Sequence, residues 1–324
     1  QEYQVGGVIL FGRNVESAGQ LAELTNGLKQ LNADAVPLFL CVDEEGGRVS
    51  RMPEEVMDLP SADTFGQRHD ASELTRLGQT LGMECAAFGF NLDFAPVADV
   101  RSNPENTVIG DRAYSGDPGR AADAAAWVDG GMREAGIISV WKHFPGHGNT
   151  ATDSHQALPV VELSREDWAR GDAVPFRRAV ECGAPAVMAG HIRMTAFDPE
   201  YPASLSHVLV SEVLREELGF TGVVCTDDLT MGAISDTYGM GEAAVLAVEA
   251  GCDLLLVCHG ADNLTQARQA LLGAVDGGRI SPARLEESVY RILALKAEYG
   301  LTNQTVEAPD VAALNQAVQA LLGE

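Results

Sequence analysis

One lysine, three histidines and one aspartate lie within the fourteen residues from Lys142 to His155, which read KHFPGHGNTATDSH. Asp153 stands two residues before His155. In a curved loop this spacing lets the carboxylate accept a hydrogen bond from one imidazole nitrogen while the other nitrogen faces a substrate. Such a pair can transfer protons near neutral pH. An Asp–His contact that only stabilises the loop explains the spacing equally well.

A second candidate for chemistry is Asp227, which ends the apolar run from Val223 to Thr226 and is followed at once by Asp228. Adjacent side chains that leave a strand point in different directions, so one of the two aspartates is expected to enter a site. A carboxylate at the rigid end of a strand is a candidate nucleophile, and Asp227 is the preferred one. A helix cap or a loop salt bridge is the alternative role, and it suits Asp228 better.

The segment from Asp43 to Arg51, DEEGGRVSR, places acids and two arginines around a glycine turn. A carboxylate such as Asp43 can accept hydrogen bonds from two vicinal sugar hydroxyls, and arginine can donate a planar fork to hydroxyls or to a carboxylate. Acidic strand ends before Gly-Gly turns are also common structural features, so this pattern alone is weak. Arg112 follows Asp111, and an exposed pair between these two neighbours is its default interpretation.

A metal site is a further alternative, because His143 and His147 have the four-residue spacing of a helical zinc pair. Pro145 and Gly146 lie between them and prevent the helix that this spacing requires. No metal site is therefore expected. Two other histidines, His191 and His259, are expected to be ordinary core or rim residues.

These polar residues follow short apolar runs that are predicted to be strands. Most runs are apolar along their whole length, as in strands that are covered on both faces. The predicted strands are Val5 to Phe11, Val36 to Asp43, Phe90 to Ala98, Gly136 to His143, Ala184 to His191, Gly222 to Asp227 and Cys252 to Cys258.

Amphipathic stretches between these runs are predicted to be helices. Ser164, and Ser281 followed by Pro282, provide two clear helix start signals. The predicted helices are Ala18 to Leu31, Ser72 to Phe88, Gly119 to Ala135, Arg165 to Cys182, Ser211 to Leu218, Gly241 to Ala250, Asn263 to Leu272 and, near the end of the chain, Val311 to Leu322.

The polar residues recur at the carboxyl ends of the predicted strands, and in a parallel barrel those ends converge on one face. A doubly wound sheet would gather ligands in a similar place, but no Gly-x-Gly-x-x-Gly opens the first unit. We therefore predict an α/β fold in which residues 1–300 form a TIM-type (β/α)8 barrel. Its first strand is expected before Gln1, and residues 301–324 are expected to form a linker and a short helix.

The amino-acid composition argues against some classes of binding partner. The chain has 324 residues, is 46% hydrophobic and carries a net charge of −25. This balance is typical of a globular protein and would repel nucleic acid or an anionic membrane surface. No run of about 18 apolar residues is present. The six cysteines form no Cys-x-x-Cys pair, so a reducing, cytoplasmic location is expected.

Taken together, KHFPGHG at 142–148 and DSH at 153–155 resemble glycoside hydrolase family 3. More narrowly, they resemble its single-domain bacterial β-N-acetylhexosaminidases. DEEGGR at 43–48 and TDDL at 226–229 extend the resemblance, which runs from Val5 to about Tyr299. Asp-x-His marks the glucosaminidase branch, whereas other branches take their acid/base from an additional domain.

The resemblance implies a role for each candidate residue. Asp227 would be the nucleophile that forms a glycosyl-enzyme, His155 would be the acid/base, and Asp153 would orient His155. This double displacement departs from the usual two-carboxylate scheme, because a histidine replaces the acid/base carboxylate. The residues expected to hold the hydroxyls of the non-reducing N-acetylglucosamine are Asp43, Arg51, Arg112, Lys142 and His143.

The implied activity is that of a retaining exo-β-N-acetylglucosaminidase that acts in peptidoglycan recycling. The expected partner is a small carbohydrate, an N-acetylglucosamine-containing muropeptide fragment, bound by a cytoplasmic monomer without metal or organic cofactor. A phosphorylase that uses phosphate in place of water, and a non-catalytic sugar-binding barrel, are the alternatives. Glu44 departs from the resemblance, because relatives often have Gln at its place beside Asp43.

Overall fold

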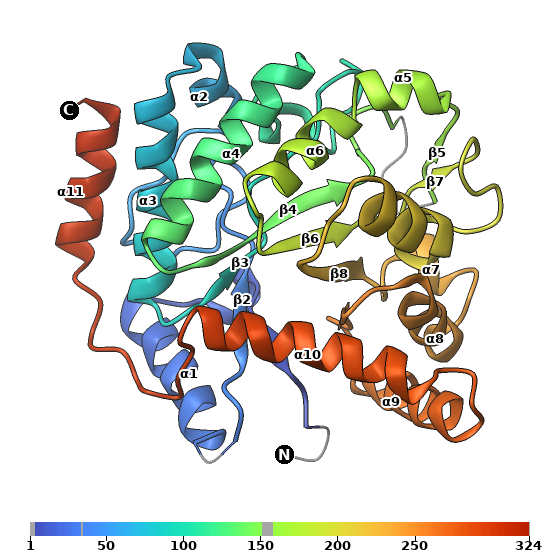
Figure 1. The fold of residues 1–324 in the computed structure, drawn as a ribbon. Helices are drawn as coiled ribbons and strands as arrows, with labels where there is room; N and C mark the ends of the chain where they lie inside the picture. The colour runs from blue at the N-terminus through green and yellow to red at the C-terminus, as the bar shows by residue number, and fades with distance from the viewer. Residues whose placement is uncertain (1–3, 34, 151–157, 324) are drawn as a thin grey trace.

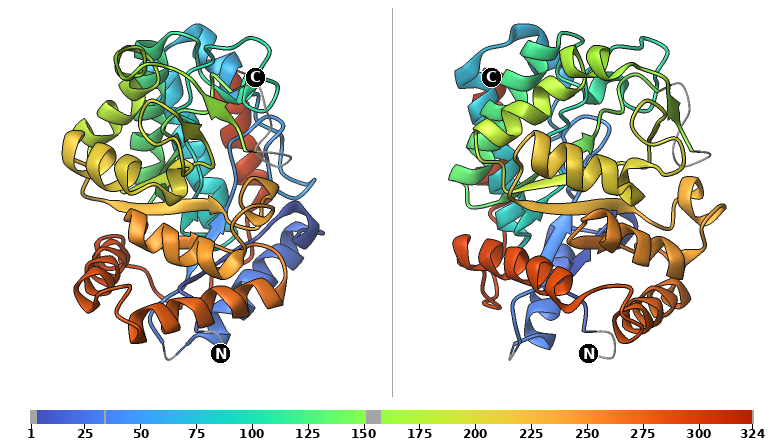
Figure 2. Two further views of the ribbon diagram at one scale, coloured as in Figure 1. Left: turned by 90° about the vertical axis from the view of Figure 1, so that its right-hand side faces the viewer. Right: turned by 45° about the vertical axis from the view of Figure 1, so that its right-hand side comes forward.

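The computed structural model describes residues 4–33, 35–150 and 158–323. At its centre lies a curled sheet of seven strands with helices packed around it (Figures 1 and 2). Each of the seven predicted strands is confirmed, although most are shorter than predicted. The strands, in their order across the sheet, are β1 (Gly7–Ile9), β2 (Phe39–Val42), β3 (Leu92–Asp93), β4 (Ile138–Phe144), β6 (Ala186–Ala189), β8 (Val223–Asp228) and β9 (Leu254–Leu256).

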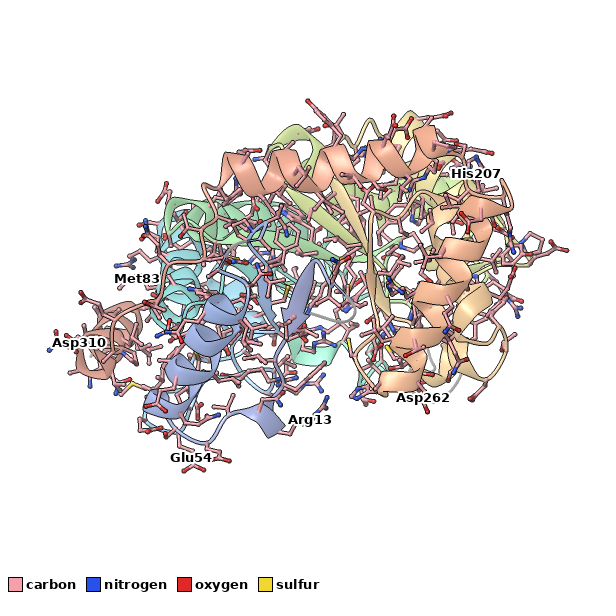
Figure 3. The ribbon with its side chains drawn as sticks, turned by 90° about the horizontal axis from the view of Figure 1, so that it is seen from below. Arg13, Glu54, Met83, His207, Asp262 and Asp310 are labelled. Carbon is pink, nitrogen blue, oxygen red and sulfur yellow. The ribbon has the colours of Figure 1, made fainter. Side chains whose placement is uncertain are left out.

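Every neighbouring pair in this sheet is parallel, so the carboxyl ends of all seven strands lie at one edge. The two outermost strands approach each other at this edge (Figure 3), where Phe11 after β1 stacks on His259 after β9 with ring centroids 5.6 Å apart. No pairing joins β1 to β9 within the described residues. The structure is thus a curled parallel sheet, and the closed (β/α)8 barrel stays a prediction.

The apolar runs form strands because both faces of the sheet are covered. Along β2, Leu40 and Val42 pack with apolar side chains of the surrounding helices. Phe39 and Cys41 point to the other face, where they join a second apolar cluster that includes Met188. This alternation buries every side chain of the strand, which is why the sequence shows a continuous apolar run instead of a polar–apolar alternation.

The predicted helices are present, with one correction. The stretch from Arg165 to Cys182 forms two helices, α5 (Arg165–Arg170) and α6 (Ala173–Glu181), which are separated at Gly171 and Asp172. The other predicted helices correspond to α1 (Ala18–Leu31), α3 (Ala71–Ala87), α4 (Pro118–Glu134), the π-helix η4 (Val208–Glu217), α8 (Met240–Ala250), α9 (Ala261–Asp276) and α11 (Val311–Leu322). The start signal at Ser281 and Pro282 is confirmed by α10 (Pro282–Glu298).

Short elements were missed by the sequence analysis. They are the helices α2 (Ala62–Arg68) and α7 (Gly232–Ser235), the small two-stranded sheet of β5 (Val160–Val161) and β7 (Arg193–Met194), and the 3-10 turns η1 (Gly12–Asn14), η2 (Gly110–Arg112) and η3 (Ala203–Leu205). None of these elements spans more than seven residues, so none is long enough to show a clear hydrophobic period.

The last helix, α11, packs against α3 with Leu314, Val318 and Leu321 buried. None of the helices in the described ranges is both long and apolar enough to cross a membrane. All six cysteines are free thiols.

Candidate active site

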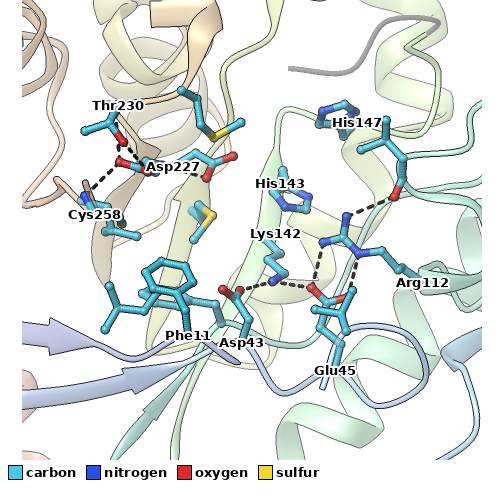
Figure 4. Close-up of a pocket in the computed structure, with 18 of the residues that line it drawn as sticks. Phe11, Asp43, Glu45, Arg112, Lys142, His143, His147, Asp227, Thr230 and Cys258 are labelled. Atoms are coloured by element: carbon cyan, nitrogen blue, oxygen red, sulfur yellow. Dashed lines mark hydrogen bonds and ion pairs between the residues drawn. The ribbon is translucent and has the colours of Figure 1, made fainter. Parts of the chain in front are cut away.

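The carboxyl ends of the strands surround a cavity of about 600 Å³ (Figure 4). This volume lies within the range of small-molecule sites, about 300–1,000 Å³. The predicted catalytic residues Asp153 and His155 lie outside the described residues. The structure brings the other predicted site residues together around the cavity: Asp43, Arg51, Arg112, Lys142, His143 and Asp227.

Lys142, on β4, is the buried cation at the floor of this cavity. Its ammonium donates to Asp43 Oδ1 at 2.8 Å and to Glu45 Oε1 at 2.5 Å. Arg112 donates from Nε and Nη2 to the two oxygens of Glu45, both at 2.8 Å. The four groups form an alternating row (Figure 4) in which Asp43 and Arg112, at the two ends, keep exposed surface of 21% and 14%. These two ends are therefore available to a ligand.

Within this row, the pKa values are shifted more by the neighbouring opposite charges than by burial. Burial would raise the pKa of Glu45, but Arg112 and Lys142 hold that pKa far below its usual range. Burial would also lower the pKa of Lys142, but Asp43 and Glu45 raise it. Glu45 and Lys142 are consequently charged at neutral pH, as a buried ion pair with good geometry requires.

The default interpretation of Arg112 was wrong. Asp111 does not pair with its neighbour; it accepts a hydrogen bond at 2.8 Å from Arg48, and both side chains are about half exposed. Arg112 instead turns inward to Glu45, a residue to which the sequence analysis gave no role. The only sequence signal for Glu45 was its place in the acidic run that follows β2, and that signal does not distinguish it from Glu44.

Asp99 is one of the polar residues that follow a predicted strand, but no role was predicted for it; it is buried and orients His143. His143 Nδ1 donates to Asp99 Oδ2 at 2.7 Å, and the backbone N–H groups of His143 and His147 donate to Asp99 Oδ1. Burial would raise the pKa of Asp99, but His143 and these hydrogen bonds lower it. With Nδ1 occupied, the remaining ring nitrogen of His143 is the one that can meet a ligand in the cavity.

The two adjacent aspartates at the end of β8 have different surroundings. Asp228 is held by its turn, since its carboxylate accepts hydrogen bonds from Thr230 and from the backbone N–H of Cys258. Among the described residues, Asp227 accepts one hydrogen bond, at 2.8 Å on Oδ1, from the backbone N–H of Asp228. Asp228 does not cap a helix, because the N-cap of α7 is Met231. The Asp228 carboxylate holds the turn and lies 3.6 Å from His259 Nε2, which fits the alternative role of a loop ion pair. Asp227 keeps acceptor capacity for a ligand in the cavity.

The surroundings of Asp227 keep it ionised. Burial alone would raise its pKa, but His191, His143, the Asp228 N–H and Lys142 lower it. Burial lowers the pKa of His191, whereas Asp43 and Glu45 raise the pKa of Lys142 and keep it cationic at neutral pH. An ionised carboxylate on a rigid strand end can act as a nucleophile.

His191 and His259 were predicted to be core or rim residues, and they lie in such positions. His191 is buried, donates from Nε2 to the carbonyl of Asp228 at 2.9 Å, and accepts from Ser204 Oγ at 2.7 Å. His259 lines the rim of the cavity beside Phe11, and its Nδ1 lies 3.4 Å from a guanidinium nitrogen of Arg13. The first is a satisfied core histidine and the second is a rim histidine, as predicted.

Among the described residues, the Arg51 side chain has few protein partners for a cation of the pocket. Its Nη1 donates to the carbonyl of Ser50 at 2.9 Å, and within the described residues no carboxylate forms an ion pair with it. Since arginine has five N–H donors, Arg51 can donate to ligand hydroxyls.

The described side chains offer no group of three or more His, Cys, Asp or Glu that could hold a metal ion. The Nδ1 atoms of His143 and His147 already bond Asp99 and Thr150. The expectation of a metal-free site remains a prediction, which the chelator experiment below tests.

Asp172, between α5 and α6, should make the stability of the protein depend on pH. It lies against Gly146, its Oδ2 has no hydrogen-bond partner among the described residues, and burial with repulsion from Asp99 raises its pKa to about 7. In the unfolded chain Asp172 has the ordinary pKa of about 3.9. The contribution of Asp172 to the stability of the folded state is therefore fully present below about pH 4, and it is lost as the pH rises to about 7.

Asp172→Asn should therefore raise the free energy of unfolding at pH 8 by about 1–3 kcal/mol over the original protein and change it little at pH 4. Urea unfolding at the two pH values measures this difference. An effect of the same size at both values would contradict the assignment.

Together, these groups can hold a polyhydroxylated ligand above an ionised carboxylate. The alternating row and His143 supply donors and acceptors for hydroxyl groups, and Phe94 and Met188 supply apolar surface. A carboxylate among hydroxyl-binding groups suits nucleophilic substitution at a sugar carbon.

Comparison with known proteins agrees with this chemistry. Residues 1–295 match the family model described as the glycosyl hydrolase family 3 N-terminal domain. A β-hexosaminidase from Nitrosomonas eutropha is 35% identical over 323 residues, which cover 97% of this chain and 92% of that protein.

Two solved structures are similar over most of the chain. A glycoside hydrolase family 3 β-N-acetylglucosaminidase from a Paenibacillus species matches with a TM-score of 0.92 and 41% identity, over 98% of this chain and 62% of that one. A family 3 glycosyl hydrolase from Mycobacterium smegmatis matches with a TM-score of 0.82 and 33% identity, over 90% of this chain and 88% of that one. This chain thus spans less than two thirds of the Paenibacillus protein.

Proposed function

This chain belongs to glycosyl hydrolase family 3, as its motifs indicated, and we propose that it is a retaining exo-β-N-acetylglucosaminidase with Asp227 as the nucleophile. The observation that carries the proposal is the position of Asp227: an ionised carboxylate at the end of β8 that shares one cavity with the hydroxyl-binding groups. The names of the N. eutropha and Paenibacillus relatives support an N-acetylhexosaminide as the substrate.

In the first step, Asp227 attacks the anomeric carbon while His155 donates a proton to the departing glycosidic oxygen. The bond to the leaving group breaks as the bond to the Asp227 oxygen forms. In the second step His155 takes a proton from water, whose oxygen attacks the same carbon and releases Asp227. Two inversions give net retention. Asp153 is proposed to hold the tautomer of His155; both residues lie outside the described ranges.

The other predicted residues would bind the sugar. Asp43, whose Oδ1 lies 2.8 Å from the Lys142 ammonium, can accept hydroxyl hydrogens. Arg112 and Arg51 can donate to sugar oxygens, and His143 presents the ring nitrogen that Asp99 leaves unoccupied. These contacts bind the substrate in both the ground state and the transition state, so they chiefly set its affinity.

The natural substrate is proposed to be a peptidoglycan-derived fragment with a terminal N-acetylglucosamine, processed in the cytoplasm by a monomer. The family resemblance supports this proposal. The division into residues 1–300 and 301–324, like the closed barrel, remains a prediction that a crystal structure of the protein would test.

The activity is tested by chromophore release from an aryl β-N-acetylglucosaminide and from the matching β-glucoside, in phosphate-free buffer with a chelator. We expect turnover of the first substrate only, at a rate that the chelator does not change. Proton NMR of the earliest product should show the β-anomer, because the mechanism retains configuration. An α-anomer as first product would contradict the double displacement.

Two other outcomes identify the alternatives. Formation of a sugar 1-phosphate when phosphate is added would favour the phosphorylase, since a neutral histidine repels an incoming anion less than a carboxylate does. Binding of N-acetylglucosamine without turnover of any hexosaminide would favour a sugar-binding protein.

A further inference from the structure

The loop from Asp43 to Arg51 is folded around the carboxyl group of Glu44. Glu44 Oε2 accepts hydrogen bonds from the backbone N–H of Arg51 at 2.7 Å and from Ser50 Oγ at 2.8 Å. Its Oε1 accepts a longer bond, 3.3 Å, from the N–H of Gly46. Glu44 does not line the cavity, whereas Asp43 and Arg51 on either side of these bonds do. Glu44 therefore connects two proposed sugar-binding residues from behind.

Two more buried acids lie behind Glu44. Asp93, at the end of β3, accepts the backbone N–H of Glu44 on Oδ1 at 2.8 Å, and its Oδ2 has no hydrogen-bond partner among the described residues. Glu84, on α3, likewise has an unpartnered Oε1 in this part of the chain. All three side chains are at most 1% exposed. None of them forms an ion pair with a described lysine or arginine.

Three buried carboxylates without a partner cation cannot all be ionised, because each charge is poorly solvated and repels the others. Burial raises the pKa of Glu44 to about 7, against the bonds from Arg51, Ser50 and Gly46. Burial and mutual repulsion also raise the pKa of Glu84 and Asp93. We expect Glu44 to ionise first as the pH rises, because it alone of the three acids accepts three hydrogen bonds from the loop in the described residues.

Other charged groups near the cluster also shift the pKa values of these acids. Asp43 raises the pKa of Asp93 and Asp58 raises that of Glu84, whereas Lys142 on β4 lowers that of Asp93. The charge of Arg51 lowers the pKa of Glu44. The Cys85 thiol on α3 faces Asp93, and burial keeps it protonated.

We propose that Glu44 is a positioning residue, whose ionisation fixes the loop that carries Asp43 and Arg51 and so sets the affinity for the sugar. A protonated Glu44 carries a hydrogen on one oxygen and accepts the loop donors weakly. An ionised Glu44 forms charge-assisted bonds that are about twice as strong. The inference rests on the proposed function, because Asp43 and Arg51 are assigned there to sugar binding.

The test is the pH dependence of KM and kcat for the aryl β-N-acetylglucosaminide, in the original protein and in Glu44→Gln. In the original protein, KM should fall about five- to tenfold between pH 6 and 8, with a midpoint near 7, as the loop bonds strengthen. Glu44→Gln keeps the shape and an acceptor oxygen but does not titrate, so the KM step should disappear. Its kcat profile should stay parallel to that of the original protein. An unchanged KM step in Glu44→Gln would overturn the proposal.

Glu84→Gln is the matched control, because it makes the same chemical change in an equally buried acid that does not bond the loop. It should keep the KM step. Loss of the step in Glu84→Gln together with its persistence in Glu44→Gln would assign the titration to Glu84 and overturn the proposal. Ser50→Ala gives a second test that leaves Glu44 in place. It removes one donor to the carboxylate, so the midpoint should move to higher pH, and an unmoved midpoint would contradict the proposal.

A binding measurement separates this inference from the proposed function. If the original protein turns over no aryl hexosaminide at any pH, the proposed function fails, and calorimetric binding of N-acetylglucosamine at pH 6 and 8 replaces KM. Tighter binding at pH 8 in the original protein, without this difference in Glu44→Gln, would still support positioning by Glu44. Equal affinities at both pH values in the original protein would overturn it.

Discussion

Asp227→Ala should lower kcat for the aryl β-N-acetylglucosaminide by about 10⁴-fold or more, a loss typical of removing a catalytic nucleophile. The variant should fold normally, because in the part of the chain that the structure describes the Asp227 side chain accepts one local hydrogen bond, from the N–H of Asp228. Steady-state kinetics and thermal unfolding measure the two effects. An unchanged rate would remove Asp227 from the mechanism.

A structural role for Asp227 can be separated from a nucleophilic one by chemical rescue. Azide added to Asp227→Ala should occupy the space left by the carboxylate and attack the anomeric carbon directly, giving an α-glycosyl azide by a single inversion. Asp228→Asn is the comparison variant, because Asp228 holds Thr230 and Cys258. That variant should lose stability and should form no azide product. Rescue by azide in Asp228→Asn but not in Asp227→Ala would assign the nucleophile to Asp228 and the structural role to Asp227.

Glu45→Gln should have the second-largest effect, on stability and activity together. Glu45 is the shared partner of Arg112 and Lys142, and its side chain is 3% exposed. Neutralising it leaves two cations close together in a buried site, which should lower the free energy of unfolding by about 3 kcal/mol. Because both cations line the sugar cavity, kcat/KM should fall about 10²- to 10³-fold. Denaturant unfolding and steady-state kinetics are the measurements.

Asp111→Asn is the matched control for Glu45→Gln. It also neutralises an acid that pairs with an arginine, but both side chains of the Arg48–Asp111 pair are about half exposed. Solvent screens such a pair, so its loss should change stability by less than about 1 kcal/mol. Equal effects of the two substitutions on stability would contradict the proposal that the buried ion pairs of Glu45 contribute more than an exposed pair.

The sheet could be predicted from the sequence because its signal is local. A run such as Val223 to Cys225 is apolar at every position, and this alone identifies a strand that is covered on both faces. The position of Asp227 at the carboxyl end of that strand, together with the parallel repeat, placed it at the shared edge. The same reasoning failed for the stretch from Arg165 to Cys182, since the break at Gly171 and Asp172 interrupts an otherwise helical pattern.

The sequence by itself therefore determined the strands, the edge at which the polar residues collect and, through its motifs, the family. The tertiary structure alone decided which charges meet there. Arg112 pairs with Glu45, 67 residues away in the chain, instead of with its neighbour Asp111. Glu44 faces Asp93, which is 49 residues away. The apolar pattern that predicts a strand lies in neighbouring residues along the chain, whereas ion pairing depends on distances in space that only the packed fold sets.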